Sequence, residues 1–302
     1  MKFPYKLKKG DTVGLLAPSS HQAYDAMHLV EKAIPVLESW GLKVKLQPGH
    51  DRKHFYLAGT DEHRARYFQE FYCNPEIKAI FITRGGYGAS RLYPLLDDDL
   101  ISRNQKIMVG LSDATSLLLY IHKTSGGIVY HGPNLASYQF HESPSKHKNR
   151  ESLHNNLFQE DFFPTYNVST IKSGTGKGKL IGGNLSLVVT TLGTPYEIDT
   201  RDKVLFLEDT KEKPYRIDRM LTHLRNAGKF ENIQGLVFGD MVGCNNDANL
   251  LWDVIEDMFG EANFPVVNGL PAGHGEFTIT MPFGSDVEVN TGADELRFIP
   301  YQ

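Results

Sequence analysis

Short apolar runs alternate with helix-like segments over residues 11–124, and this alternation constrains the fold more than any other feature of the chain. The apolar runs are bounded by Gly, Pro or Ser and are too short for buried helices, which indicates strands. The predicted strands are 12–18, 42–46, 77–83 and 107–110, and the predicted helices are 25–39, 61–72, a short one after Gly88, and 114–124. This order predicts a parallel sheet covered on both faces, in which ligands bind beyond the carboxyl ends of the strands.

The rest of the chain has a different pattern. At 302 residues the chain exceeds the usual size of one compact core, so two domains of about 150 residues each are expected. Residues 139–179 are rich in His, Ser, Lys, Asn and Gly and predict a linker. The strand-like segments beyond it are 204–207, 235–238, 287–290 and 295–299, with one clear helix at 215–227. We therefore expect an N-terminal α/β domain at 1–138, a linker at 139–179 and a C-terminal β-rich α/β domain at 180–302.

Composition excludes several classes of protein. Hydrophobic residues make up 40% of the chain and charged residues 23%, values that are typical of ordinary globular proteins. The net charge of −4, with Lys and Arg scattered along the chain, argues against a nucleic-acid partner. No apolar run matches a signal peptide or a membrane span, so a cytoplasmic protein is expected. Cys73 and Cys244 form no CxxC motif and predict neither a disulfide framework nor a metal site.

A serine follows the strand at 107–110, where the sequence reads Gly110-Leu111-Ser112-Asp113-Ala114. A serine on a tight strand-to-helix turn has an exposed hydroxyl, and the first helical N–H groups lie beside it. Ala114 replaces the second glycine of the G-x-S-x-G motif of α/β-hydrolases. The alternative interpretation is that Ser112 or Asp113 is simply a helix N-cap.

A glycine-rich segment, Arg84-Gly85-Gly86-Tyr87-Gly88, follows the predicted strand at 77–83. Glycine lets a backbone N–H approach an anion or a developing oxyanion closely. The segment matches neither G-x-G-x-x-G nor the phosphate-binding loop, which argues against a nucleotide site. A plain glycine turn remains the alternative.

The second half of the chain contains two acids at the end of an apolar run and a histidine between two glycines. Glu208 and Asp209 end an apolar run, and His274 lies between Gly273 and Gly275. An acid can orient a histidine, and a loop histidine can act as a general base. Each has a structural alternative, as a solvated strand end or an incidental loop residue. Together with Ser112, however, they would supply the nucleophile, acid and base of one mechanism.

These segments together resemble the LD-carboxypeptidase family of serine peptidases, which also includes self-immunity peptidases acting on microcin C. The resemblance spans nearly the whole chain. It is carried by Arg84-Gly85-Gly86-Tyr87-Gly88 with Arg91-Leu92, Gly110-Leu111-Ser112-Asp113-Ala114-Thr115, His131-Gly132-Pro133, Gly182-Gly183-Asn184-Leu185, Leu207-Glu208-Asp209, Tyr215-Arg216-Ile217-Asp218-Arg219-Met220-Leu221 and Gly273-His274-Gly275.

The resemblance implies a role for each of these residues. Ser112 would be the nucleophile, His274 the general base and Glu208 the acid that orients it. The backbone N–H groups of Gly86 and Asp113 would form the oxyanion hole. The implied fold is a parallel-sheet domain related to class I glutamine amidotransferases, followed by a β-rich domain that supplies Glu208 and His274, with the site between the domains.

The implied reaction is release of a terminal D-alanine from murein tetrapeptides, without cofactor or metal, by a protein that is commonly a homodimer in this family. Arg84 and Arg91 are candidates for binding the substrate carboxylate, although both could be purely structural. The alternative substrate is a peptidyl or aminoacyl-nucleotide conjugate, for which Phe162, Phe163 and Tyr166 could form an aromatic platform. Whether Glu208 or Asp209 faces His274 stays open.

Overall fold

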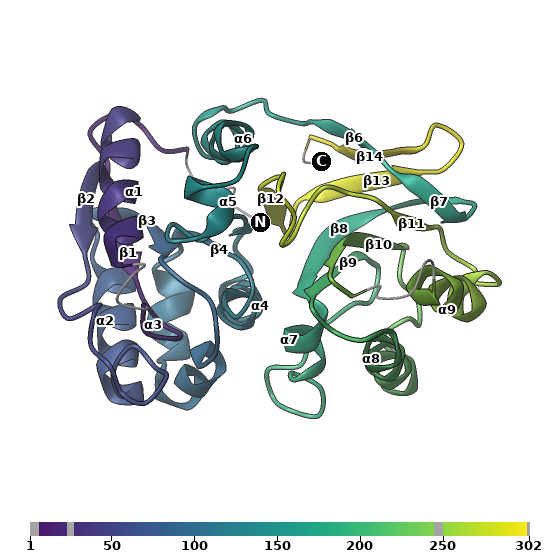
Figure 1. Cartoon of the computed structure of the whole chain (residues 1–302), viewed down its shortest axis with the longest axis horizontal. Helices are drawn as coiled ribbons and strands as arrows, with labels where there is room; N and C mark the ends of the chain where they lie inside the picture. The colour runs from purple at the N-terminus through teal and green to yellow at the C-terminus, as the bar shows by residue number, and fades with distance from the viewer. Residues whose placement is uncertain (1–5, 23–26, 245–249, 301–302) are drawn as a thin grey trace. The chain divides into compact units, whose positions relative to one another are not determined.

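The computed structural model describes residues 6–22, 27–244 and 250–300, and the chain divides into two compact units (Figure 1). The first unit contains residues 1–160 together with 279–282. The second contains residues 161–278 and 283–302. The mixed α/β architecture predicted from the sequence is confirmed, and each unit has its own sheet.

The first unit is built on a six-stranded sheet with the order β12-β5-β4-β3-β1-β2. The neighbouring pairs from β2 to β5 are parallel, as the alternation of strands and helices predicts. The strands are β1 (Thr12–Leu16), β2 (Lys43–Leu46), β3 (Ile77–Ile82), β4 (Ile107–Gly110), β5 (Val129–His131) and β12 (Met281–Phe283). The helices are α1 (Met27–Ser39), α2 (Asp61–Cys73), η2 (Ala89–Leu95), α3 (Asp98–Arg103), α4 (Ala114–Ser125), α5 (Tyr138–His141) and α6 (Lys146–Phe158).

The second unit is built on an eight-stranded mixed sheet with the order β6-β14-β13-β8-β9-β10-β11-β7. Strands β8 to β11 pair in parallel, and the outer pairs are antiparallel. The strands are β6 (Thr165–Asn167), β7 (Ser169–Lys172), β8 (Thr175–Asn184), β9 (Lys203–Thr210), β10 (Gly235–Val242), β11 (Val266–Asn268), β13 (Asp286–Asn290) and β14 (Glu295–Phe298). The helices are α7 (Leu185–Val189), α8 (Pro214–Asn226) and α9 (Leu250–Phe259).

The segment 139–179, predicted to be a linker, contains regular structure instead. It holds most of α5, the whole of α6, β6 and β7, and the first half of β8. The sequence did not predict helix α6 because its buried face includes the polar residues Asn149, Ser152 and Asn156, which interrupt the helical spacing of apolar residues. Each of these side chains is hydrogen-bonded to the backbone of another segment. Polar side chains can therefore line a packed helix face in this chain.

The end of the predicted linker, residues 175–179, forms the first half of β8. A Cβ at Gly176 would lie 1.6 Å from the Gln234 carbonyl oxygen, and one at Gly182 would lie 1.8 Å from that of Phe206. Only glycine fits where neighbouring backbones approach this closely. These glycines therefore serve sheet packing.

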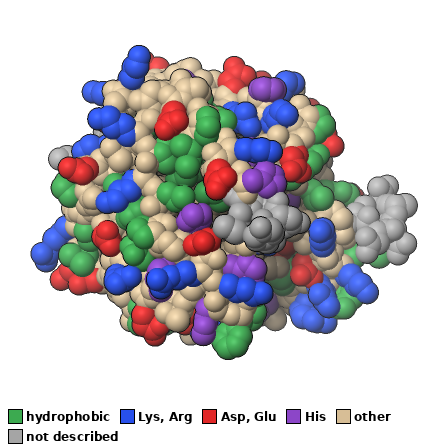
Figure 2. Space-filling view, turned by 60° about the vertical axis from the view of Figure 1, so that its left-hand side comes forward, with side chains coloured by type: hydrophobic (Ala, Val, Ile, Leu, Met, Phe, Trp, Pro, Cys, Tyr) green, Lys and Arg blue, Asp and Glu red, His purple; other side chains and the backbone are tan. Residues whose placement is uncertain are grey.

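Charged side chains of both signs are interspersed on the face shown in Figure 2, in agreement with the scattered Lys and Arg of the sequence. Within the described residues, every helix is too short or too polar to cross a bilayer. Neither cysteine forms a disulfide: Cys244 is buried and Cys73 is partly buried.

Candidate functional site

Ser112 lies on the turn between β4 and α4, in the first unit. Its backbone is left-handed, with a φ of 67°, a conformation that costs a residue with a side chain on the order of 1–3 kcal/mol. The strand and helix meet closely, because a Cβ at Gly110 would lie 2.5 Å from that of Ala114. The sharp strand-to-helix turn predicted for Ser112 is thus present, and its strain is typical of a functional position.

Asn134 fixes this turn from the segment that follows β5. Its side-chain oxygen accepts a hydrogen bond from the Leu111 N–H, and its amide nitrogen donates to the Leu111 carbonyl, both at 3.0 Å. Asn134 is 5% exposed, so both bonds are shielded from water. The residue before Ser112 is therefore clamped on both of its backbone polar groups.

The glycine-rich loop after β3 packs directly against Ser112. A Cβ at Gly85 would lie 3.0 Å from the Ser112 Cβ and 3.2 Å from its Oγ. Gly86 has a φ of 103°, and the next N–H, of Tyr87, donates to the Ser20 Oγ at 3.1 Å. Within the described part of the chain, the N–H groups of Gly86 and Asp113 have no acceptor. Both are available to bind an oxyanion.

Arg64, a residue that sequence reasoning missed, joins the loops after β1 and β3. Arg64 is only 1% exposed. Its guanidinium donates to the carbonyls of Pro18 and Gly88, the second at 2.8 Å. It also pairs with Asp61. Asp113 adds a further tie, because its Oδ2 accepts from the Ala89 N–H at 2.9 Å. Buried, hydrogen-bonded charge of this kind holds the loops around Ser112 in one arrangement.

Arg84 and Arg91 are both occupied by protein partners. Arg84 donates to the His21 carbonyl at 2.5 Å, which ties the glycine-rich loop to the loop after β1. Arg91 binds the Oδ2 of Asp61 through Nε at 2.9 Å and Nη2 at 2.7 Å, and its side chain is 41% exposed. Arg84 is partly buried, whereas Arg91 is exposed.

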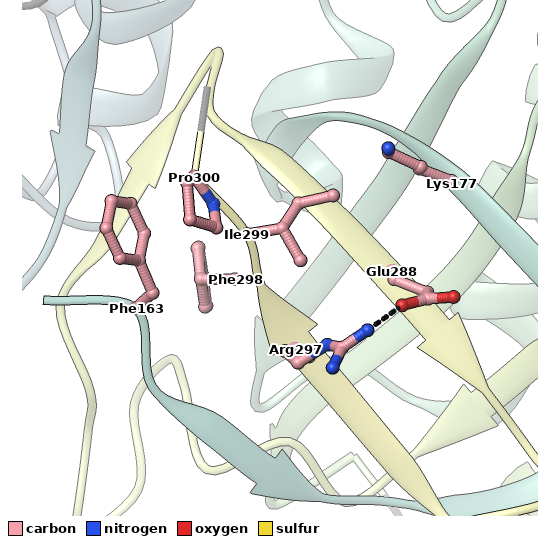
Figure 3. Close-up of a pocket in the computed structure, with 7 residues that line it drawn as sticks. All are labelled: Phe163, Lys177, Glu288, Arg297, Phe298, Ile299 and Pro300. Atoms are coloured by element: carbon pink, nitrogen blue, oxygen red, sulfur yellow. Dashed lines mark hydrogen bonds and ion pairs between the residues drawn. The ribbon is translucent and has the colours of Figure 1, made fainter. Parts of the chain in front are cut away.

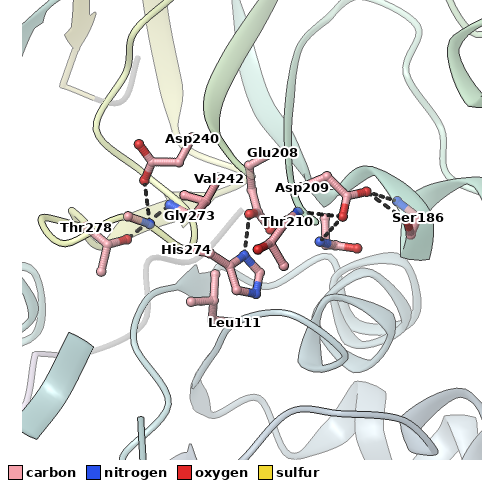
Figure 4. A network of polar contacts seen from close by, with 12 residues as sticks. Leu111, Ser186, Glu208, Asp209, Thr210, Asp240, Val242, Gly273, His274 and Thr278 are labelled. Atoms are coloured by element: carbon pink, nitrogen blue, oxygen red, sulfur yellow. Dashed lines mark hydrogen bonds and ion pairs between the residues drawn. The ribbon is translucent and has the colours of Figure 1, made fainter. Parts of the chain in front are cut away.

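Glu208 and His274 meet within the second unit (Figure 4). Glu208 lies near the end of β9 and is fully buried, and its Oε2 is 2.6 Å from His274 Nδ1. A carboxylate can only accept, so Nδ1 carries the proton and Nε2 of the neutral ring keeps its lone pair. This is the tautomer that a general base requires.

Charge and burial compete at this pair. Burial lowers the pKa of His274, but the charge and hydrogen bond of Glu208 outweigh it, so the pKa lies above the ordinary value. Burial raises the pKa of Glu208, against the opposing effect of His274. The negative charge of Glu208 therefore favours the protonated form of the His274 ring.

Asp209 is excluded as the partner of His274, which resolves the choice that the sequence left open. Its Oδ2 accepts from the N–H and Oγ of Ser186, at 2.9 and 2.8 Å. Its Oδ1 accepts from Asn184 and from the Thr210 N–H. Asp209 therefore anchors the start of α7.

The structure brings together two groups of candidate residues. Ser112, Asp113 and the glycine-rich loop adjoin one another in the first unit, and Glu208 and His274 in the second. Sequence reasoning missed Arg64, Asn134 and Asp240, whose N–H donates to the Ala272 carbonyl in the loop of His274. Asn134 and Asp240 are polar residues beside apolar neighbours in the sequence, whereas Arg64 lies in a charged stretch and carries no such signal.

The three residues considered as an aromatic platform lie at the start of the second unit. Phe163 borders a pocket of about 540 Å³ with Phe298 and Pro300, beside the Arg297–Glu288 ion pair (Figure 3). Tyr166 meets Phe298 edge to face, with ring centres 6.2 Å apart. Phe162 is partly exposed. Among the described residues, no cluster of His, Cys, Asp and Glu could hold a metal ion.

Two family models match the chain. Residues 13–132 match the LD-carboxypeptidase N-terminal domain, and residues 177–289 match the LD-carboxypeptidase C-terminal domain. The two matches fall in the first and second units respectively, apart from residues 279–282.

Individual proteins agree with these models. A probable murein peptide carboxypeptidase of Bacillus subtilis is 38% identical over 297 residues, covering 95% of this chain and 91% of the relative. The microcin C7 self-immunity protein MccF of Escherichia coli is 27% identical over 316 residues, covering 94% and 92%. The solved structure of muramoyltetrapeptide carboxypeptidase from Oxalobacter formigenes has a TM-score of 0.84 at 26% identity, covering 96% and 99%.

Proposed function

The chain belongs to the LD-carboxypeptidase family of peptidases, and from this membership we propose that it is a serine carboxypeptidase releasing terminal D-alanine from murein tetrapeptides. The observation that most supports this proposal is the buried Glu208 bound to His274 Nδ1 at 2.6 Å. In this pair His274 is the candidate base and Glu208 the acid that orients it. With Ser112 they follow one another along the chain in the order serine, acid, histidine. The proposed setting is cell-wall recycling in the cytoplasm, with a homodimer as the proposed assembly.

In the proposed mechanism, Ser112 attacks the carbonyl of the L,D-peptide bond while His274 Nε2 takes the hydroxyl proton. Glu208 stabilises the resulting imidazolium. The backbone N–H groups of Gly86 and Asp113 bind the oxyanion, and a lost donor of this kind costs on the order of 2.7–4 kcal/mol in the transition state. His274 then protonates the leaving amine of D-alanine, and water hydrolyses the acyl-enzyme.

A carboxypeptidase must also recognise a free carboxylate. We propose Arg91 as the stronger of the two candidates for this role, because its side chain is exposed whereas that of Arg84 is partly buried. Binding of the carboxylate would compete with the Asp61 contact or share the remaining N–H groups.

The test of this function compares a murein tetrapeptide with the same peptide carrying a C-terminal amide. We expect release of free D-alanine from the acid and at least about tenfold slower cleavage of the amide. The amide has no negative charge for the arginine to bind, and the loss of a charged hydrogen bond costs about 1.4 kcal/mol or more. Products are identified by mass spectrometry. Equal cleavage of both peptides, or cleavage at an internal bond, would contradict a carboxypeptidase.

The second candidate function is cleavage of peptidyl or aminoacyl-nucleotide conjugates, which the 27% identity to MccF favours. It requires a surface for the nucleotide base near the catalytic residues. The pocket beside Phe163 is lined by Lys177 at the start of β8, whereas Glu208 pairs with Asn184 at the other end of that strand, so this pocket does not adjoin the Glu208–His274 pair. A competition assay with the tetrapeptide and an aminoacyl sulfamoyl adenosine separates the two. Preferential cleavage of the adenosine conjugate would replace the murein peptide as the proposed substrate.

A further inference from the structure

A second carboxylate, which is partly buried, lies beside the Glu208–His274 pair. Asp240 is in β10, the strand next to β9. Phe238 pairs with Leu207 and Met241 with Asp209, so two residues of β10 face the single residue Glu208 on β9. An irregularity of this kind redirects side chains and is common next to active sites. Here it leaves Asp240 beside Glu208.

Asp240 binds the His274 loop on both sides of the histidine. Its backbone N–H donates to the Ala272 carbonyl at 2.8 Å. Its carboxylate Oδ2 accepts from the Gly275 N–H at 3.0 Å. Ala272 precedes His274 by two residues and Gly275 follows it directly. The two bonds therefore bracket the histidine.

The loop requires such an anchor because His274 lies between two glycines. Gly273 has a φ of 131°, and glycine backbones have no intrinsic preference for one conformation. The approach is also close: a Cβ at Gly275 would lie 2.6 Å from the Asp240 Oδ2. A side chain at position 275 would therefore displace the Asp240 carboxylate.

We propose that Asp240 is a positioning residue for the general base: its carboxylate holds the His274 loop through the Gly275 N–H, and its charge stabilises the imidazolium. This inference rests on the proposed role of His274. Two ionisable groups face the carboxylate, Glu208 from β9 and His274 from the loop. Asp240 touches neither substrate nor the reacting atoms in this role, so its effect passes through His274.

The electrostatics agree with this geometry. Burial raises the pKa of Asp240 to about 6, with the charge of Glu208 adding to the effect and the Gly275 N–H and His274 opposing it. The negative charge of Asp240 in turn raises the pKa of His274. Loss of that charge therefore lowers the pKa of His274, and loss of the side chain also frees the Gly275 N–H.

Two variants separate the charge of Asp240 from its hydrogen bond. Asp240→Asn keeps an acceptor for Gly275 but removes the charge, and Asp240→Ala removes both. NMR titration of the His274 ring is expected to give a lower pKa in both variants. Hydrogen exchange at the Gly275 amide is expected to stay slow in Asp240→Asn and to become faster in Asp240→Ala. Asp257→Asn, an exposed carboxylate on α9, is the matched control and should change neither.

Kinetics on the murein tetrapeptide complete the test. For Asp240→Ala we expect kcat to fall roughly 10- to 100-fold with KM within about twofold, since misplacing a catalytic group by about 1 Å has effects of this size. Asp240→Asn should retain more activity and shift the acid limb of its pH profile downward.

The NMR and exchange readouts need no turnover, so they decide the role of Asp240 even if the wild type does not cleave the tetrapeptide. An unchanged His274 pKa together with unchanged Gly275 exchange in Asp240→Ala would overturn the inference. Equal kcat in Asp240→Ala and wild type would do the same.

Discussion

Ser112 is partly buried and has a strained backbone, and the strain can be measured apart from the chemistry. Replacing Ser112 with Gly allows a φ of 67° without cost, whereas Ala keeps the cost. We expect Ser112→Gly to be more stable to denaturant than Ser112→Ala by about 1 kcal/mol, with both variants inactive. Urea unfolding followed by circular dichroism measures the difference. Equal stability of the two variants would show that the turn is unstrained.

His274 gives the pH dependence of the proposed reaction. The base must be neutral, and its pKa lies above the ordinary value of about 6.5 because Glu208 outweighs burial. The rate should therefore rise with pH through an inflection above that value. Glu208→Gln leaves the burial and removes the charge, so the inflection should move to lower pH while kcat/KM falls about 10³- to 10⁴-fold.

A pH–rate profile of kcat/KM for wild type and Glu208→Gln measures both effects. A shift of the inflection to higher pH in the variant would contradict the assigned electrostatics. A shift without loss of rate would separate Glu208 from catalysis.

At the scale of elements, the turn from β4 into α4 depends on Asn134, a residue 22 positions beyond Ser112 in the sequence. Asn134→Ala leaves the N–H and carbonyl of Leu111 buried without partners, which costs about 1–3 kcal/mol of stability. We also expect kcat to fall while KM changes little, because the serine turn loosens. Calorimetry and steady-state kinetics measure the two.

Asn226→Ala, an exposed asparagine at the end of α8, is the control for Asn134. It should alter stability by no more than about 0.5 kcal/mol. If Asn134→Ala resembles this control, the clamp on Leu111 has no energetic role.

The elements that sequence reasoning predicted are those with a local signal. Strands β1, β3 and β4 are apolar runs buried in the sheet, and α8 has Ile217, Leu221 and Leu224 on one buried face. The first half of β8 was assigned to the linker because its glycines pack against strands that are distant in sequence: a Cβ at Gly176 would collide with the Gln234 carbonyl oxygen. Close backbone contacts between strands have no local signature.

The residues of the candidate site also divide into those with a local sequence signal and those without one. Ser112, Glu208 and His274 stand at strand ends or between glycines, so residue type and position indicate chemistry. Arg64 and Asn134 act through long-range bonds to Gly88 and Leu111, which only the folded chain reveals.

At the scale of the whole molecule, the chain returns to the first unit late in the sequence. Residues 279–282 belong to that unit, and β12 lies beside β5 at the edge of its sheet. The Thr280 carbonyl accepts from Asn156 at 3.0 Å, and its N–H donates to the Ser152 Oγ at 2.9 Å. The first unit is therefore incomplete in an N-terminal fragment that ends before residue 279.

A fragment of residues 1–160 tests this dependence. It lacks β12, exposes the edge of β5 and leaves the partners of Thr280 unpaired, so we expect a lower Tm and association in solution. Differential scanning calorimetry and light scattering compare it with the full chain. A monomeric fragment that melts at the temperature of the full chain would show that β12 contributes nothing.

The central claim is that Ser112 is the nucleophile of a carboxypeptidase, and the most direct measurement is release of D-alanine from a murein tetrapeptide by wild type and Ser112→Ala. Mass spectrometry should detect the tripeptide and free D-alanine with wild type. The variant should fold normally and be slower by about 10⁶-fold, the scale seen when a triad serine is removed. Release by Ser112→Ala at a rate comparable to wild type would contradict the account.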